Sequence, residues 1–323
     1  MIDLACVLLG LVLLYFGAEW LVAGASELAV RLGISPLVVG LTVVAFGTSA
    51  PELAVSIDSN LNGSGGMAIG NVLGSNICNL CLVLGVAALV WPLGIQRQVI
   101  RREIPILLVA TVVFAFFLRD GVISQMEAGI FAGGIILYVV TSLLQARKDP
   151  TADSSDDIPP ELVEAAQAGG VKRALWNVTL IIIGIGVLVL GANRMVYGGA
   201  NLARAFGVSE AVIGLTLFAF GTSLPELATS IVAALKKQGD IIVGNAVGSC
   251  IFNILAVVGF TGLIAPLEAT GITDFDVAVM IVTSFLVLPL MWHRFNINRW
   301  EGALLTMCYL GYVGWLVVSE FSA

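Results

Sequence analysis

Two segments of the chain repeat one another at a constant offset of 174 residues, and this repeat constrains the fold more than any other feature. Residues 40–59 read GLTVVAFGTSAPELAVSIDS and residues 214–233 read GLTLFAFGTSLPELATSIVA, with 14 of 20 positions identical. The same offset aligns residues 70–85 with residues 244–259, where 8 of 16 positions are identical. A repeat of this length predicts two halves built on one structural plan.

The chain is far more apolar than a soluble protein. Of its 323 residues, 59% are hydrophobic and 11% are charged, and the mean hydropathy is +1.02. Soluble proteins carry about 25% charged residues. This composition excludes a soluble enzyme, a nucleic-acid-binding protein and a disordered chain. No Ser/His or Cys/His arrangement suggests an enzyme within the membrane either.

The apolar residues are gathered in ten stretches, each close to the roughly 20 residues that a helix needs to cross a bilayer. We expect spans at 4–25, 36–60, 67–91, 103–119, 125–145, 174–200, 211–235, 241–265, 275–292 and 301–319. The runs are continuous, which favours helices over the alternating pattern of a membrane β-barrel.

Each half of the chain holds five expected spans, an odd number, so the second half enters the membrane from the opposite side. We therefore expect an all-α polytopic membrane protein with ten transmembrane helices, arranged as two inverted-topology five-helix repeats at 1–145 and 174–323. A polar, acidic linker at 146–173 joins them. This arrangement is typical of many secondary transporters.

The distribution of Lys and Arg predicts the orientation. With ten spans, the loops on the side of the linker carry most of these residues, and the opposite loops carry only Arg119 and Arg204. Cytoplasmic loops are enriched in Lys and Arg. We expect a multi-pass protein of the cell or inner membrane, with a cytoplasmic linker and both termini outside. The oligomeric state is left open.

A Gly-Thr-Ser-x-Pro-Glu motif lies in the middle of the second and seventh spans, at residues 47–52 and 221–226. Proline lacks a backbone donor and clashes with the preceding turn, and glycine loosens the helix further. We expect both helices to be broken here. The carbonyls around Ala45 and Ala219 would then lose their helical partners and point into a cavity, because only there is irregular backbone tolerated in a membrane.

Each motif also places an acid, Glu52 or Glu226, inside the membrane. A charge at this depth costs about 3 kcal/mol on insertion scales. Neither motif contains a Lys or Arg. A mobile cation is the expected partner, and two carboxylates balance one divalent ion. Where the helix is intact, serines three residues before and four residues after each acid share its face; these are Ser49, Ser56, Ser223 and Ser230.

The next span in each half carries a stripe of polar residues at i, i+4 and i+8. The stripes are Asn71, Ser75 and Asn79, and Asn245, Ser249 and Asn253. One such stripe is explained by hydrogen bonds that hold helices together. Two stripes matched to two broken helices favour a binding site. Carboxylate, amide, hydroxyl and carbonyl oxygens suit a hard cation such as Ca²⁺. The absence of His from these segments, with Cys250 one turn off the Asn253 stripe, argues against zinc or copper.

The sequences GTSAPEL and GTSLPEL, with the following GNVLGSNICN and GNAVGSCIFN, resemble the two alpha-repeats of the calcium/cation antiporter superfamily, in its Na⁺/Ca²⁺ exchanger-like branch. The two halves, ten spans and linker fit this family as well. The resemblance implies an antiporter that exchanges Ca²⁺ for Na⁺ by alternating access, with these inorganic cations as substrates and no cofactor.

The resemblance also implies roles for individual residues. A calcium site would be built by Glu52 and Glu226 with Thr48 and Thr222. Sodium sites would use Ser49, Ser75, Ser223, Ser249 and the carbonyls of Ala45 and Ala219. Asn79 and Asn253 would lie at the centre.

The chain departs from the family pattern at three positions. Many sodium-coupled relatives have Asp at one of the positions of Asn79 and Asn253, whereas an Asn pair resembles proton-coupled members. Cys250 replaces the Asn expected in the Gly-Ser-Asn motif. A Ca²⁺/H⁺ antiporter is therefore a second candidate function. A cation channel and a membrane protein that binds an ion without transporting it are two further candidates.

Overall fold

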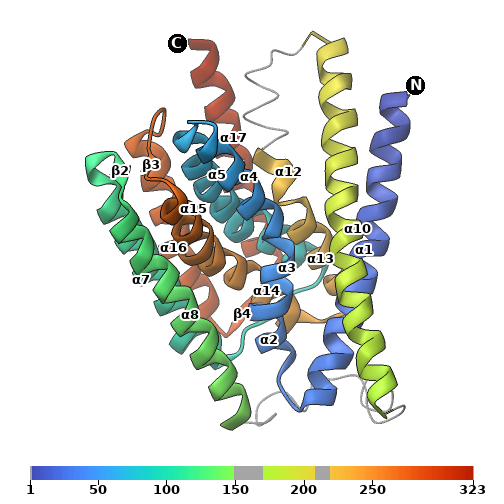
Figure 1. Cartoon of the computed structure of the whole chain (residues 1–323). Helices are drawn as coiled ribbons and strands as arrows, with labels where there is room; N and C mark the ends of the chain where they lie inside the picture. The colour runs from blue at the N-terminus through green and yellow to red at the C-terminus, as the bar shows by residue number, and fades with distance from the viewer. Residues whose placement is uncertain (1, 149–169, 208–218, 323) are drawn as a thin grey trace.

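The computed structural model describes residues 2–148, 170–207 and 219–322. Most of the linker, at 149–169, and the start of the seventh expected span, at 211–218, lie outside these ranges. The described chain is almost entirely helical (Figure 1), and the all-α prediction is confirmed.

The helical elements of the two halves follow the same order. The first half contains α1 (Ile2–Leu32), α2 (Pro36–Val39), the π-helical η1 (Gly40–Val44), α3 (Ala45–Thr48), α4 (Ala50–Leu61), α5 (Gly65–Ile77), the π-helical η2 (Cys78–Val83), α6 (Leu84–Val90), the π-helical η3 (Val99–Glu103), α7 (Ile104–Phe117), the 3-10 turn η4 (Leu118–Asp120) and α8 (Gln125–Lys148). The second half contains α10 (Gly170–Ala205), α12 (Ala219–Thr222), α13 (Leu224–Leu235), α14 (Gly239–Phe252), the π-helical η6 (Asn253–Val257), α15 (Val258–Ile264), α16 (Asp274–Trp292) and α17 (Arg299–Ser322).

Two short β-ladders connect the halves. Strand β1 (Leu93–Gly94) pairs antiparallel with β4 (Asn296–Ile297), and β2 (Val122–Ile123) pairs antiparallel with β3 (Leu267–Glu268). The repeat offset relates β1 to β3 and β2 to β4, so the two ladders are equivalent. They were not expected from the sequence, because a two-residue strand has no hydrophobic periodicity to recognise.

Seven helices of the described chain are long and apolar enough to cross a bilayer, and the bent pair Pro36–Thr48 and Ala50–Leu61 adds an eighth. The expected span at 103–119 is present as the shorter α7, which continues directly from η3 and into η4. The expected span at 211–235 is described only from residue 219 onward. These helices make the protein an integral, multi-pass membrane protein.

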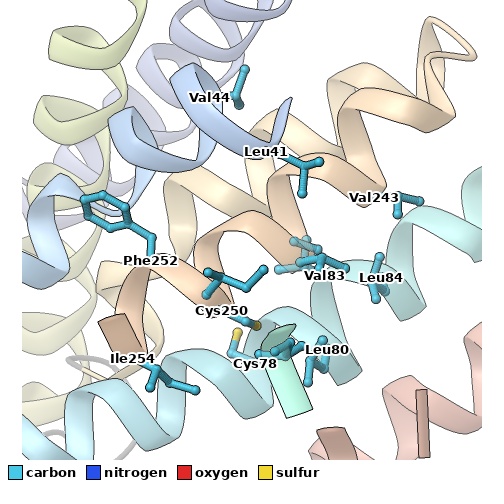
Figure 2. Packing of buried hydrophobic residues seen from close by; sticks show 14 of the residues in the cluster. Leu41, Val44, Cys78, Leu80, Val83, Leu84, Val243, Cys250, Phe252 and Ile254 are labelled. Carbon is cyan, nitrogen blue, oxygen red and sulfur yellow. The ribbon is translucent and has the colours of Figure 1, made fainter. Parts of the chain in front are cut away.

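The helices that carry the polar stripes form the interior of the molecule. In the most apolar window of Gly239–Ile264 every residue is buried, and in that of Gly65–Val90 83% are buried, against 33% for Ile2–Leu32. α1 and α10 lie side by side at one edge, and α7 and α8 lie at the opposite edge (Figure 1). Apolar side chains such as Leu41 and Val243 fill the space around α14 (Figure 2).

Candidate functional site

The helix of the first motif is interrupted at Ser49. α3 ends at Thr48, α4 begins at Ala50, and the two parts of the span are bent by 40°. Ser49 has φ −87° and ψ 6°, outside helical values, and Ser223 in the second motif has φ −88° and ψ 5°. Each break lies two residues before a proline, which is the second residue of the following helix. The N–H groups of a helix's first turn have no partner within the helix, so the N–H that proline lacks is not missed there.

The expectation that both alanine carbonyls lose their helical partners is wrong for Ala45. Its carbonyl accepts the N–H of Ser49 at 3.0 Å. The donor that Pro51 lacks is the one that would face Gly47, four residues earlier, so the proline does not free the Ala45 carbonyl. In the second half, the N–H of Ser223 donates to Phe220 at 3.1 Å, and therefore this donor does not occupy the Ala219 carbonyl.

The two acids are buried completely and are linked by serines of the opposite half. Glu52 and Glu226 are both 0% exposed. The Ser49 hydroxyl donates to Oε1 of Glu226 at 3.0 Å, and the Ser223 hydroxyl donates to Oε1 of Glu52 at 3.4 Å. The two motifs therefore converge, and each broken helix supplies both an acid and the donor for its partner's acid.

This crossing differs from the helix-face pattern expected for the serines. Ser49 does not pair with the acid of its own motif, because the helix is broken at Ser49 itself and the spacing of three residues no longer defines a face. The serine four residues after each acid contacts the next span instead. Ser56 accepts from Asn71 at 3.0 Å, and Ser230 accepts from Asn245 at 3.2 Å.

The first asparagine of each stripe holds both motifs together. The amide nitrogen of Asn71 donates to the backbone carbonyl of Glu52 at 3.1 Å, and Asn245 does the same for Glu226 at 3.2 Å. Their amide oxygens accept from threonines of the opposite half, since Thr48 donates to Asn245 and Thr222 donates to Asn71, both at 3.1 Å. These bonds fix the position of each acid on its helix.

The remaining carboxylate oxygens have no hydrogen-bond donor from the described residues. Oε2 of Glu52 and Oε2 of Glu226 are both buried and unpartnered in this part of the chain. The ion pairs found there involve Glu103, Glu27 and Glu19, and neither motif acid takes part in one. A buried carboxylate without a counter-charge is unfavourable, so these two acids are chemically suited to pair with a cation.

The second serine of each stripe lies beside one of the acids. Ser249 lies 3.5 Å from Oε1 of Glu226, and Ser75 lies beside Glu52. Asn79 and Asn253 are both 0% exposed. Asn79 is the second residue of η2, and Asn253 is the first residue of η6. The hydrogen bonds therefore join the two acids with the expected threonines and serines and with the first asparagine of each stripe, while the last asparagine of each stripe is buried further along the same helices.

One residue of this cluster, Asn76, was not expected from the sequence. It is 0% exposed, and its amide oxygen accepts from Asn253 at 3.2 Å. Asn76 lies off the i, i+4, i+8 stripe, one residue after Ser75, so helical spacing gave no reason to select it. The Gly-Ser-Asn motif that contains it was the available signal.

Two acids of α1 have ion-pair partners outside the site. Glu27 accepts two bonds from Arg173 of α10, at 2.7 and 2.9 Å, and Glu19 pairs with Lys236 at the end of α13 at 2.7 Å. No role for these acids could be predicted from the sequence. Their partners are 146 and 217 residues away, so only the folded chain relates them.

The arrangement suits the binding of hard cations. Two buried carboxylates lie among hydroxyl and amide groups of both halves, and oxygen is the ligand that Ca²⁺ and Na⁺ prefer. Among the described residues, no group of three or more His, Cys, Asp or Glu side chains is placed to hold a transition metal.

Comparison with known proteins places this site in a family. The family model described as sodium/calcium exchanger protein matches residues 2–144 and 176–318. The putative antiporter CaxA of Alkalimonas amylolytica is 39% identical over 315 residues, which cover 95% of this chain and 96% of that protein. The sodium/calcium exchanger MaX1 of Methanosarcina acetivorans is 33% identical over 344 residues, covering 97% of each.

A solved structure gives the same result. The sodium-calcium exchanger NCX_Mj, soaked with Na⁺ and Sr²⁺, superposes with a TM-score of 0.82 at 31% identity, over 97% of each chain. The matches extend over both halves, including both copies of the acidic motif. The chain belongs to the sodium/calcium exchanger protein family.

Proposed function

We propose that this protein is a secondary active antiporter that exchanges Ca²⁺ for Na⁺ across the membrane by alternating access. The observation that carries the proposal is the pair Glu52 and Glu226, fully buried, joined across the repeat by serine hydroxyls, and each with one oxygen unpartnered in the described chain. Its relatives MaX1 and NCX_Mj are named sodium/calcium exchangers, which supports the choice of ions.

In this proposal Ca²⁺ binds between Glu52 and Glu226, with Thr48 and Thr222 at its sides. The unpartnered Oε2 atoms are the natural first ligands. Na⁺ binds at flanking positions made by the hydroxyls of Ser49, Ser75, Ser223 and Ser249 and by the carbonyls of Ala45 and Ala219. Asn79 and Asn253 complete the centre of the site.

The proposed topology is ten transmembrane helices in two inverted five-helix repeats, 1–145 and 174–323. Two arrangements support it. α1 begins and α17 ends at one end of the molecule, and α8 ends and α10 begins at the other (Figure 1). Because loops on the linker's side carry most Lys and Arg, that end is proposed to be cytoplasmic, with both termini outside.

The buried charge explains why exchange is favoured over leak. Without a cation, the site holds two carboxylates in an apolar interior, and such a state is costly to carry through the occluded conformation. Binding of Ca²⁺ or of Na⁺ neutralises the charge. Only the ion-bound protein then switches between opening to one side of the membrane and opening to the other, and this couples the two ion flows.

A Ca²⁺/H⁺ antiporter is the second candidate, and one feature favours it. Asn occupies both central positions, so Glu52 and Glu226 are the two carboxylates of the cluster. A site with two carboxylates holds fewer Na⁺ ions than one with three. Protons bound to the two acids could then be the ions exchanged for Ca²⁺.

Uptake of radioactive calcium into proteoliposomes distinguishes these functions. We expect an outward sodium gradient to drive uptake, and a potassium or proton gradient to fail. Uptake driven by protons alone would assign the second candidate. Conductance far above carrier rates without coupled counterflow would overturn both in favour of a channel.

Replacing one acid tests the site itself. Glu226→Gln removes one of the two charges, and we expect a loss of about 100-fold in exchange rate, which corresponds to about 3 kcal/mol. Glu268→Gln, at an exposed glutamate outside the site, is the matched control and keeps the rate. Exchange at full rate in Glu226→Gln would contradict the site assignment.

A further inference from the structure

Most side-chain hydrogen bonds of the site follow the repeat symmetry. The bonds from Thr48 to Asn245 and from Thr222 to Asn71 have the same length, and the Asn71 and Asn245 amides have equivalent partners. The symmetry fails at the second serine of the stripes, because Ser249 donates to Glu226 while the Ser75 hydroxyl has no partner among the described residues. It also fails at the central pair of asparagines, Asn79 and Asn253.

Asn253 is held by its amide nitrogen. This nitrogen donates to Oδ1 of Asn76 at 3.2 Å, while its own Oδ1 has no partner among the described residues. An amide fixed through its nitrogen keeps its oxygen pointing in one direction. Asn253 is therefore a pre-oriented oxygen ligand.

Asn79 lacks the equivalent bond because Cys250 stands where the second half would need an asparagine. The residue related to Asn76 by the repeat offset is Cys250, whose thiol lies beside Asn79 and donates to the Asn76 backbone carbonyl at 3.7 Å. Figure 2 shows the Cys250 side chain near Cys78, one residue before Asn79. A thiol is a weak partner for an amide. Both amide atoms of Asn79 are without a conventional hydrogen bond from the described chain, at 0% exposure.

The two central residues are therefore the same chemically, but the Asn253 side chain is held by a hydrogen bond and the Asn79 side chain is not. The position of the Asn253 oxygen is set by its anchor, and the position of the Asn79 oxygen is not. Selectivity among divalent cations depends on cavity size, ligand number and ligand flexibility. A ligand that is held rigidly rejects ions of the wrong radius, whereas a ligand that can turn adjusts to them.

We propose that Cys250 is a specificity-determining residue: by leaving the Asn79 amide unanchored, it widens the range of divalent-cation radii that the transport site accepts, so that Sr²⁺ and Ba²⁺ compete with Ca²⁺. This inference rests on the proposed function of the site. Cys250 acts through Asn79 and is not itself a ligand.

The experiment compares Ca²⁺ with Ba²⁺ in the full-length protein and two reciprocal variants. Cys250→Asn supplies the missing anchor, and we expect the Ca²⁺/Ba²⁺ ratio of kcat/KM to rise about fivefold, the effect of one neutral hydrogen bond. Asn76→Cys removes the anchor of Asn253, and we expect the ratio to fall by a similar factor. Cys250→Ala removes the thiol without offering an amide, and its ratio should equal that of the unmodified protein.

Binding of Ca²⁺ and of Ba²⁺ to the purified protein, measured by calorimetry, supplies a second readout that does not depend on counterflow. An unchanged ratio in both Cys250→Asn and Asn76→Cys would overturn the inference, as would an equal shift in Cys250→Ala. If Cys250→Asn does not fold, Asn76→Cys still decides. If no gradient drives calcium uptake while the binding ratios shift as expected, the proposed function fails and this inference stands.

Discussion

The serine of each broken motif serves the acid of the other half. Ser49 lies three residues from Glu52 in sequence, yet its hydroxyl donates to Glu226 at 3.0 Å, and Ser223 contacts Glu52 at 3.4 Å. A hydrogen bond to a charged group contributes about 1.5–3 kcal/mol. Each acid is therefore positioned by a donor whose location depends on the packing of the two halves.

Ser49→Ala tests this crossing at the level of one atom. It removes the shorter of the two serine–glutamate bonds between the halves, and it also removes one proposed sodium ligand. We therefore expect the Na⁺ concentration for half-maximal exchange to rise about tenfold. The measurement is sodium-dependent calcium counterflow at varied Na⁺. Ser284→Ala, at a buried serine of α16 whose hydroxyl bonds only the carbonyl of Met280, is the matched control. An equal rise in both variants would contradict the specific role of Ser49.

The pairing of α1 with α10 depends on glycines at seven-residue intervals. They are Gly10, Gly17 and Gly24 in α1, and Gly184, Gly191 and Gly198 in α10. A Cβ at Gly184 would lie 2.8 Å from the Gly17 carbonyl oxygen and 2.8 Å from the Leu21 nitrogen. Close approach of backbones is the main way in which helices associate within lipid, so this pair behaves as one unit beside the site.

Gly184→Ala should separate α1 from α10. The added methyl group meets backbone atoms that cannot move aside, so we expect a loss of about 1–3 kcal/mol in stability, seen as a lower melting temperature of the purified protein. Gly186→Ala, two residues away, has no atom within 4 Å of its Cβ position and should keep or slightly raise the melting temperature. Equal melting temperatures for the two variants would refute the close-packing argument.

At the scale of the molecule, two contacts between α1 and the end of α13 have no repeat-related equivalent among the described residues. Lys236, which follows α13, pairs with Glu19 at 2.7 Å, and Ser26 donates to Gln238 at 2.9 Å. The repeat offset relates Glu19 to Asn193 and Lys236 to Asn62, which cannot form an ion pair. These two contacts therefore tie α1 to the end of α13 in a way that the repeat symmetry does not reproduce in the described chain.

Lys236→Ala should weaken this contact. Because both side chains are partly exposed, the pair contributes about 0.5–1 kcal/mol, and we expect hydrogen–deuterium exchange at the end of α13 to accelerate about two- to fivefold. The exchanged pair Glu19→Lys with Lys236→Glu should restore the original rate. Lys237→Ala is the matched control, since Lys237 stacks on Trp91 instead of pairing with α1. An unchanged rate in Lys236→Ala would refute the contribution of the ion pair.

The repeat and the apolar runs predicted the helical membrane fold, the breaks before Pro51 and Pro225, and the burial of the acids. These features follow from local properties: a proline breaks a helix wherever it stands, and an apolar stretch is driven out of water regardless of its neighbours. The β-ladders, Asn76 and the partners of Glu19 and Glu27 were not predicted, because they depend on contacts between distant segments. The expectation that the Ala45 carbonyl loses its helical partner was wrong, because the N–H that Pro51 lacks would have bonded to Gly47 and not to Ala45.

The sequence by itself predicted most of the polar groups in this part of the interior: two acids, their threonines and serines, and the asparagines of the stripes, each duplicated at the same offset. Only the tertiary structure decided how they are connected. The crossing of Ser49 to Glu226 and the unequal anchoring of Asn79 and Asn253 arise where the two halves meet. The physical reason is that a hydrogen bond depends on distance and direction between atoms, and the position of one half against the other is fixed by packing across the whole interior.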